Sequence, residues 1–539
     1  MLTKEQKSNL RDTLFRHLDG IAIAPSAYAL HDKGVLDYLL EKRSASLSEM
    51  TFQFSANEGY LNVALRLLTS QGWLEMDIDN EKDEIIFVTN EKSSKVFKLI
   101  PIYSDVVELL KFSENFHRRK FELQPFLLWE KISKKYLEHY DLMQWDNKNS
   151  LAYQVLKHIE GILVGPTVVA LGMGGMFHKY FMDTSFRPEE FHKDAEAFER
   201  LLNFFVELGW FDRKNGTYSF TEEGLFFARR ASAYGVTVSY IPMFRHLDEM
   251  IFGKADLLRN VSIGEREKHV DREMNVWGSG GAHSAYFKKM DEVIKEVFNR
   301  PLDDQPAGIL DMGCGNGAFL IHAFDVIENQ TFRGQHLEDH PLFLVGADFN
   351  EAALKVTRGN LINADIWAKV IWGDIGRPDL LANKLKEDYG INLRDLLNVR
   401  TFLDHNRIWS DPNSEEDSKQ SNSSGAFAHR GKRIPNNLVR KNLKEHFRKW
   451  QPYVDHHGLL LIELHTLPPH VAAQNIGRTA VTAYDGTHGF SDQYIVELEV
   501  FLNVLEEVGL HRDDRFSHKF PNSELATVSI NLFSRHSSL

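Results

Sequence analysis

The sequence predicts an α/β protein in which two mainly helical units precede a parallel-sheet domain, and three observations support this fold class. Residues 308–317 read Gly-Ile-Leu-Asp-Met-Gly-Cys-Gly-Asn-Gly, an apolar run that ends in an acid and then turns on glycines, as buried strands of parallel sheets do before a helix. Residues 17–40 recur in similar form at 158–181, which indicates a duplicated unit. At 539 residues the chain is too long to fold around a single hydrophobic core, and about three domains are expected.

The duplicated unit has a winged-helix outline. The identities are His17/His158, Gly20/Gly161, Ile21/Ile162, Pro25/Pro166, Ala29/Ala170, Leu30/Leu171 and Gly34/Gly175. Each copy is followed by a helical pattern that stops at Gly-Trp (72–73 and 209–210) and then by a strand that ends in threonine. Helices, a glycine-terminated helix and a β-wing in this order predict winged-helix-like units at 1–105 and 150–255, joined by a helical bridge at 106–149.

Winged helices often bind DNA, but the candidate recognition helices, 57–71 and 193–208, are acidic or mixed, and the net charge of the chain is −13. We therefore expect no nucleic-acid partner and assign the units to homodimerisation and to closing a substrate pocket. No apolar run approaches the ~18 residues of a membrane span, so no membrane partner is expected. The single cysteine, Cys314, and the absence of an apolar leader predict a cytoplasmic protein.

Glycines punctuate the chain directly before the sheet domain. Residues 278–281 read Gly-Ser-Gly-Gly, and a helical pattern follows over 284–298. Such a stretch predicts a hinge, or a lid over a ligand, within 256–300. A plain linker is the alternative interpretation. The sheet domain then occupies 301–539.

Acids follow three successive strands of the predicted sheet. After the glycine turn, a second apolar run ends in Asp348, where a carboxylate accepts hydrogen bonds from ribose hydroxyls, and a third run ends in Asp374, which suits an exocyclic amine. This order resembles the Rossmann-like, seven-stranded class I S-adenosylmethionine-dependent methyltransferases. The resemblance implies that the methionine part is held by Asp311, Gly313, Gly315 and Gly317, the ribose by Asp348 and the adenine by Asp374. A dinucleotide-binding dehydrogenase or an unliganded α/β domain is the alternative.

Histidines and carboxylates gather where the fourth and fifth strands end, at the edge where open α/β sheets bind ligands. One interpretation is general-base catalysis by a histidine that a carboxylate orients. The other is a divalent metal held by two histidines and a carboxylate or amide, although the spacings match no short metal signature. The candidate catalytic residues are His405, Asp404, His465 and Glu463, and the candidate metal ligands are His465, His488, Gln493 and Asp404.

Two further segments interrupt this region. Residues 410–425 are polar and without apolar periodicity, which predicts a mobile loop. Residues 428–450 hold eight basic side chains against one acid. In a chain of net negative charge this local reversal suits an anionic partner, such as a carrier protein or a coenzyme A thioester, and a solvated helix face is the alternative.

Four segments, 400–407, 425–433, 462–466 and 487–493, are similar to the metal-dependent C-methyltransferases of polyketide synthase starter modules of the apratoxin type. This resemblance implies a malonyl-type thioester on an acyl carrier protein as methyl acceptor, a mononuclear iron or manganese ion, and a place in polyketide-like biosynthesis. Two alternatives remain open. One is a metal-free O- or N-methyltransferase of a small molecule with a histidine base. The other is a winged-helix regulator with a methyltransferase-fold sensor.

Overall fold

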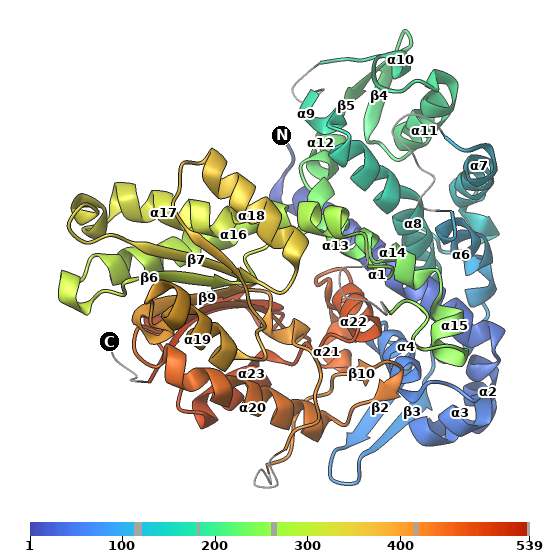
Figure 1. Cartoon of the computed structure of the whole chain (residues 1–539). Helices are drawn as coiled ribbons and strands as arrows, with labels where there is room; N and C mark the ends of the chain where they lie inside the picture. The colour runs from blue at the N-terminus through green and yellow to red at the C-terminus, as the bar shows by residue number, and fades with distance from the viewer. Residues whose placement is uncertain (113–120, 180–183, 260–266, 414–418, 536–539) are drawn as a thin grey trace.

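The computed structural model describes residues 1–112, 121–179, 184–259, 267–413 and 419–535. A helical half that holds the N-terminus lies on one side of the molecule and the sheet domain that holds the C-terminus on the other (Figure 1). Helix α16 (Arg272–Phe298) runs from the first half into the second.

The two copies of the repeat are the long helices α1 (Lys4–Asp32) and α8 (Leu151–Met173), which pack against each other. They cross at repeated glycines: a Cβ added at Gly20 would lie 2.3 Å from the Cα of His158, and one added at Gly161 would lie 2.3 Å from the carbonyl oxygen of His17. Each copy therefore contributes one histidine and one glycine to the same crossing. Among the described helices, α8 alone is long and apolar enough to span a membrane, but 83% of its apolar window is buried inside the protein.

The first unit has the predicted helices and wing. It comprises α1, α2 (Val35–Lys42), β1 (Ser44–Ser46), α3 (Leu47–Phe54), α4 (Glu58–Ser70), β2 (Leu74–Asp79) and β3 (Glu84–Thr89), with the strands in the order β1-β3-β2. Ser46 ends β1 and caps α3, because its side chain accepts a hydrogen bond from the Glu49 N–H at 3.1 Å. The candidate recognition helix is α4, and its residues 59–70 are all buried, packed against α21 (Pro469–Gln474) and α22 (Val481–Phe490) of the sheet domain.

The second unit repeats this plan. The bridge supplies α6 (Ser104–Leu110) and α7 (Leu123–Leu137), and α8 is followed by α11 (Ala195–Glu207), β4 (Phe211–Lys214), β5 (Thr217–Phe220) and α12 (Glu222–Ala228). Asp194 starts α11 by accepting a hydrogen bond from the Ala197 N–H at 3.1 Å. The β4–β5 hairpin is the predicted wing.

The predicted hinge at 278–281 is wrong, because these residues lie inside α16. They follow α13 (Ala231–Ser239), α14 (Ile241–Phe244) and α15 (Leu247–Phe252). A Cβ added at Gly278 would lie 2.6 Å from the Gly235 carbonyl carbon in α13, and one added at Gly235 would lie 2.6 Å from the Gly278 Cα. Gly278 therefore allows α16 and α13 to approach closely, and it does not interrupt the helix.

The sheet domain carries the predicted parallel sheet. Its strands are β6 (Gly308–Met312), β7 (Phe343–Asp348), β8 (Lys369–Trp372), β9 (Leu396–Thr401), β12 (Leu459–Leu464), β13 (His511–Arg512), β14 (His518–Phe520) and β15 (Val528–Ser534). The order is β13-β15-β12-β9-β6-β7-β8, with β14 also paired to β15. The strands β6, β7, β8, β9 and β12 are parallel to one another, and β15 is antiparallel to β12. The short β13 adds an eighth strand to the predicted seven.

Helices cover both faces of this sheet (Figure 1). Apolar side chains of α19 (Pro378–Tyr389), α20 (Asn436–Val454) and α23 (Leu498–Glu507) form the core on one face. Those of α16, α17 (Ala318–Gln330) and α18 (Glu351–Asn363) form the core on the other. The carboxyl ends of the parallel strands therefore lie at one edge, where ligands bind in open α/β sheets.

Candidate active site

The turn after β6 has the shape of a ligand cradle. Gly313, Gly315 and Gly317 have φ values of 82°, 55° and 79°. Residues that carry a side chain rarely adopt this left-handed backbone conformation. A Cβ at Gly313 would also lie 2.8 Å from the Leu403 side chain, so the turn touches the segment that follows β9. The sequence uses glycine here because both the backbone angle and the space require it.

Two acids at this edge have the geometry expected of cofactor ligands. Asp311 is 1% exposed, its Oδ1 has no hydrogen-bond partner among the described residues, and burial, with the nearby Asp348, raises its pKa to about 8. Asp348 accepts hydrogen bonds from the Gly315 N–H at 3.0 Å and the Asn350 N–H at 2.8 Å, and burial raises its pKa. The structure thus brings Asp311, the glycines and Asp348 together, and an unpaired buried carboxylate fits the ammonium group of a bound S-adenosylmethionine.

Asp374 lies two residues beyond β8, beside this cradle. Its Oδ1 accepts a hydrogen bond from the Gly376 N–H at 2.7 Å. In the sheet, Asp348 is paired with Trp372, so both acids lie at the ends of neighbouring strands. This is the place expected for the ribose and adenine contacts.

His405 and Glu463 form a pair between two strand ends. Glu463 belongs to β12 and is 2% exposed. Its Oε1 lies 2.5 Å from His405 Nδ1, and its Oε2 accepts from the His405 N–H at 3.2 Å. The carboxylate therefore fixes the imidazole, whose Nε2 has no hydrogen-bond partner within the described chain. A histidine held in this way can serve as a base or as a metal ligand.

His488 in α22 lies beside His405, with ring centroids 5.0 Å apart. Its Nδ1 lies 2.7 Å from the Tyr484 carbonyl oxygen, which leaves Nε2 without a partner among the residues that the structure describes. Burial, and secondarily His405, lowers the pKa of His488 to about 3, so the ring is neutral at physiological pH. Gln493 donates from Nε2 to Tyr240 Oη at 3.0 Å, and its backbone N–H donates to the His488 carbonyl at 2.9 Å.

The predicted roles of His465 as base or ligand do not agree with its surroundings. His465 is fully buried, with Nδ1 3.3 Å from the Val496 carbonyl and Nε2 2.8 Å from Ser529 Oγ. Its ring packs on Phe501. Because both nitrogens are engaged inside the core, His465 is a packing residue and is not available to a substrate or metal.

The carboxylate of Asp404 is likewise engaged elsewhere. Asp404 Oδ1 accepts from Arg400 at 2.5 Å and lies 2.8 Å from His446 Nε2. Burial raises the pKa of Asp404, but these two partners outweigh it, and the pKa falls below its ordinary value. Asp404 therefore anchors the segment that carries His405 through Oδ1, whereas its buried Oδ2 has no hydrogen-bond partner among the described residues. Its predicted catalytic and ligand roles stay predictions.

No group of three or more His, Cys, Asp or Glu side chains is arranged to hold a metal ion in the described part of the chain. The predicted set of His465, His488, Gln493 and Asp404 is therefore not assembled. The structure does bring together two imidazoles, those of His405 and His488. Gln493 is joined to His488 through its backbone N–H, and its side-chain amide donates to Tyr240 and Ser491.

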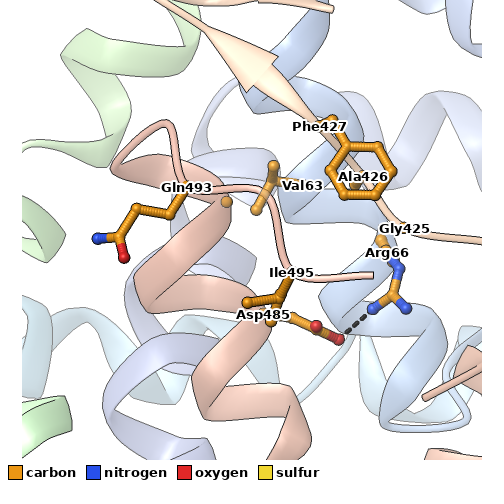
Figure 2. Close-up of a pocket in the computed structure, with 9 residues that line it drawn as sticks. Val63, Arg66, Gly425, Ala426, Phe427, Asp485, Gln493 and Ile495 are labelled. Atoms are coloured by element: carbon orange, nitrogen blue, oxygen red, sulfur yellow. Dashed lines mark hydrogen bonds and ion pairs between the residues drawn. The ribbon is translucent and has the colours of Figure 1, made fainter. Parts of the chain in front are cut away.

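Sequence reasoning missed Arg66. This side chain leaves α4, is 1% exposed, and pairs with Asp485 of α22; it also donates to the carbonyls of Ser424 at 2.9 Å and Leu467 at 2.8 Å. The pair borders a cavity of about 10 Å³, room for about one water molecule. Figure 2 shows Arg66 directed at Asp485 on one side of this cavity, with the amide of Gln493 turned away on the other. The only sequence signal was one arginine within an apolar helical stretch.

The predicted mobile loop is only partly open to test, since residues 414–418 lie outside the described ones. The part at 419–425 is packed: Ser421 and Ser423 are buried, and the Ser424 N–H donates to Glu497 Oε1 at 2.8 Å. Several basic residues of 428–450 are engaged within the chain. Arg433 pairs with Glu58 and Asp83, and Arg440 and Lys444 pair with Glu507.

Comparisons with known proteins agree with this arrangement. A family model of the AprA MT2-like domain matches residues 267–531, one of the AprA winged helix domain matches 160–254, and one of the AprA N-terminal domain matches 10–76. No curated protein sequence matches the chain.

Solved structures give similarity at low identity. An O-methyltransferase family protein from Burkholderia thailandensis is 12% identical, with 70% of this chain and 95% of that chain covered and a TM-score of 0.39. The mitomycin 7-O-methyltransferase MmcR is 12% identical, with 71% and 97% covered and a TM-score of 0.40. The CurJ carbon methyltransferase is 12% identical, with 82% and 98% covered and a TM-score of 0.32.

The three family models follow one another in chain order over the first unit, the second unit and the sheet domain. The sheet carries the glycine turn and the acids of the cofactor site. The chain is therefore an S-adenosylmethionine-dependent methyltransferase of the AprA type, with an AprA N-terminal domain and a winged helix domain before its methyltransferase domain.

Proposed function

We propose that this methyltransferase transfers the methyl group to the α-carbon of a malonyl-type acyl thioester on a carrier protein, with the help of a divalent iron or manganese ion, in polyketide-like biosynthesis. The observation that carries the proposal is the pair of histidines at the cofactor edge. The ring centroids of His405 and His488 are 5.0 Å apart, and each ring is held through Nδ1 while its Nε2 has no hydrogen-bond partner among the described residues.

These residues fit a metal ion in the chemistry of their surroundings. A metal-binding histidine usually bonds its other nitrogen to a carboxylate or a carbonyl, which Glu463 provides for His405 and the Tyr484 carbonyl provides for His488. Gln493 has its amide nitrogen engaged with Tyr240, which leaves the amide oxygen for a ligand. Two imidazoles and an oxygen suit non-haem iron or manganese.

Such an ion, when bound, supplies Lewis acidity toward the carbonyl oxygens of the acceptor and lowers the cost of removing the α-proton. The chain supplies the remainder. The turn at Gly313 and the carboxylate of Asp311 hold the methionine part of the donor, and Leu403 links that turn to the segment of His405. In the transfer, the α-carbon first loses its proton to solvent. The bond between the sulfonium sulfur and the methyl carbon then breaks, which leaves a neutral thioether, and a bond from the methyl to the α-carbon forms.

A second function is favoured by one specific observation, the distance of 2.5 Å between His405 Nδ1 and Glu463 Oε1. A histidine held by a carboxylate is a general base. Without a metal, the same pair would remove the proton from an oxygen or nitrogen acceptor of a small molecule during methylation.

The position of α4 supports a small-molecule or carrier-bound substrate rather than DNA. Its residues 59–70 are buried against the sheet domain, so the face that a recognition helix would offer to DNA is used inside the protein.

The experiment that separates the two functions is elemental analysis of protein purified without chelator or affinity metal, together with mass detection of methyl transfer from S-adenosylmethionine to malonyl-coenzyme A. We expect about one equivalent of iron or manganese, lost with the activity in His488→Ala and retained in His456→Ala, a matched variant of an exposed histidine. A metal-free protein that methylates, and that loses activity only in His405→Ala, would overturn the metal-assisted proposal.

A further inference from the structure

The side chain of Arg66 reaches from α4 of the first unit into the sheet domain and joins two segments that lead to the histidine pair. Its Nη2 donates to Thr466 Oγ1 at 3.1 Å and to the Leu467 carbonyl at 2.8 Å, and its Nη1 pairs with the carboxylate of Asp485 (Figure 2). Thr466 Oγ1 in turn donates to Asp485 Oδ1 at 2.6 Å. Arg66, Thr466 and Asp485 are all buried, so they form a closed set of hydrogen bonds shielded from water.

Both segments joined in this way carry part of the histidine site. On one side, Thr466 follows Glu463 by three residues, and Glu463 Oε1 lies 2.5 Å from His405 Nδ1. On the other side, Asp485 precedes His488 by three residues within α22, which is just under one turn of the helix. The guanidinium between them therefore fixes the end of β12 against α22, and with them the two rings whose centroids lie 5.0 Å apart.

The packing of α22 on α4 leaves little freedom around this contact. A Cβ added at Gly489 would lie 2.8 Å from the Val63 side chain, and one added at Gly486 would lie 3.3 Å from the Leu67 side chain. These two glycines flank His488 in the sequence, so α22 lies against α4 where it carries the histidine. The position of His488 therefore depends on that of α4.

We propose that Arg66 is a positioning residue of the active site. By joining the end of β12 to α22, it sets the separation of His405 and His488, so the first unit completes a site that the sheet domain carries. The inference rests on the proposed function, since that function gives the two histidines their role. An arginine suits this task because its planar guanidinium donates in several fixed directions at once, whereas the ammonium of a lysine is a point charge.

The test removes this link and leaves no unpaired buried charge. Arg66→Met combined with Asp485→Leu replaces the buried pair by apolar side chains, a change that folded proteins often tolerate. Arg333→Met is the matched control, because Arg333 is also buried and donates to two carbonyls, those of His340 at 2.9 Å and Pro341 at 3.1 Å. These partners precede β7, at the opposite edge of the sheet from the histidines.

Four quantities are measured for each variant: the free energy of unfolding in urea, kcat for methyl transfer to malonyl-coenzyme A, the Kd for S-adenosylmethionine, and the separation of the two rings in a crystal structure. We expect the double variant to lower kcat about tenfold or more, because a displacement of about 1 Å can lower a rate about a hundredfold. The separation of the ring centroids should change from 5.0 Å by about 1 Å, with the Kd for S-adenosylmethionine unchanged. Arg333→Met should lose stability and keep both kcat and the ring separation.

A purely structural role for Arg66 predicts a different result. A double variant whose kcat stays within about twofold of the wild-type value would overturn the inference. A fall in kcat with the ring centroids still 5.0 Å apart would overturn it as well, because the loss would then have another cause.

A second perturbation moves the same helix without a change of charge, and it decides the question if the double variant does not fold. Gly489→Ala should push α22 away from α4 and lower kcat in the same way, because the added methyl group meets Val63. Adding Val63→Ala makes room for that methyl group and should restore kcat. Full activity in Gly489→Ala alone would count against the inference.

The ring separation keeps this inference distinct from the proposed function. If the wild-type protein methylates no thioester and binds no Mn²⁺, the proposed function fails. The separation of His405 and His488 in crystals of the double variant then still decides whether Arg66 positions them.

Discussion

The unpaired carboxylate of Asp311 makes the binding of S-adenosylmethionine depend on pH in a defined direction. With a pKa of about 8 in the free protein, about one Asp311 side chain in ten is ionised at pH 7 and about one in a hundred at pH 6. Only the ionised form pairs with the ammonium group of the ligand. The dissociation constant should therefore fall about tenfold from pH 6 to pH 7, which is a gain of about 1.4 kcal/mol in binding free energy. The ligand's own ammonium group stays protonated over this range, because an α-amino group has a pKa of about 7.7–8.0.

Isothermal titration calorimetry checks this prediction at pH 6.0, 6.5 and 7.0, each in two buffers that differ in ionisation enthalpy. Close to one proton should be released for each ligand bound. Asp311→Asn should bind more weakly and without dependence on pH, whereas Asp374→Asn, which removes the predicted adenine contact, should bind more weakly but keep the same dependence on pH. A wild-type affinity that is constant from pH 6 to pH 7 would refute the argument from burial.

Three other changes have defined consequences. Arg66→Met leaves Asp485 as an unpaired buried charge and should destabilise the protein by about 3–5 kcal/mol; adding Asp485→Leu should recover most of the loss in urea unfolding. Gly278→Ala places a methyl group against backbone and should cost about 1–3 kcal/mol, while Gly280→Ala, which meets no atom within 4 Å, should leave the melting temperature unchanged or raised. Glu463→Gln should lower kcat about tenfold or more at unchanged affinity for S-adenosylmethionine, and a change in that affinity alone would contradict its role.

The glycine turn and the acids beside it could be predicted from sequence because their determinants are local, and their contacts with a cofactor stay predictions. The strand, the turn and the acid occupy ten residues at 308–317, and the positive φ angles of the turn favour glycine. The repeat could be recognised for a related reason. The crossing of α1 and α8 has room only for glycine at positions 20 and 161, so both copies have glycine at the matching position.

The histidine site could not be assigned residue by residue. His405 and His465 follow strands and His488 lies in α22, and the sequence does not show which of their ring nitrogens form hydrogen bonds inside the core. Strand alternation put Glu463 and His465 on one face, but His465 lies one residue past the end of β12 and turns to Ser529. The contact of Arg66 with Asp485 depends on docking between segments far apart in the chain, which no local pattern encodes.

The crossing of α1 and α8 joins two copies of one unit inside a single polypeptide. Assembly of two separate subunits obeys mass action and weakens on dilution, but the halves of this crossing cannot part when the protein is scarce. Substitutions also need not be mirrored. The first copy has buried its helix α4 in the sheet domain, whereas the corresponding α11 of the second keeps a polar outer face with Glu196, Arg200 and Glu207. Covalent linkage thus lets two similar units differ in what their matching helices contact.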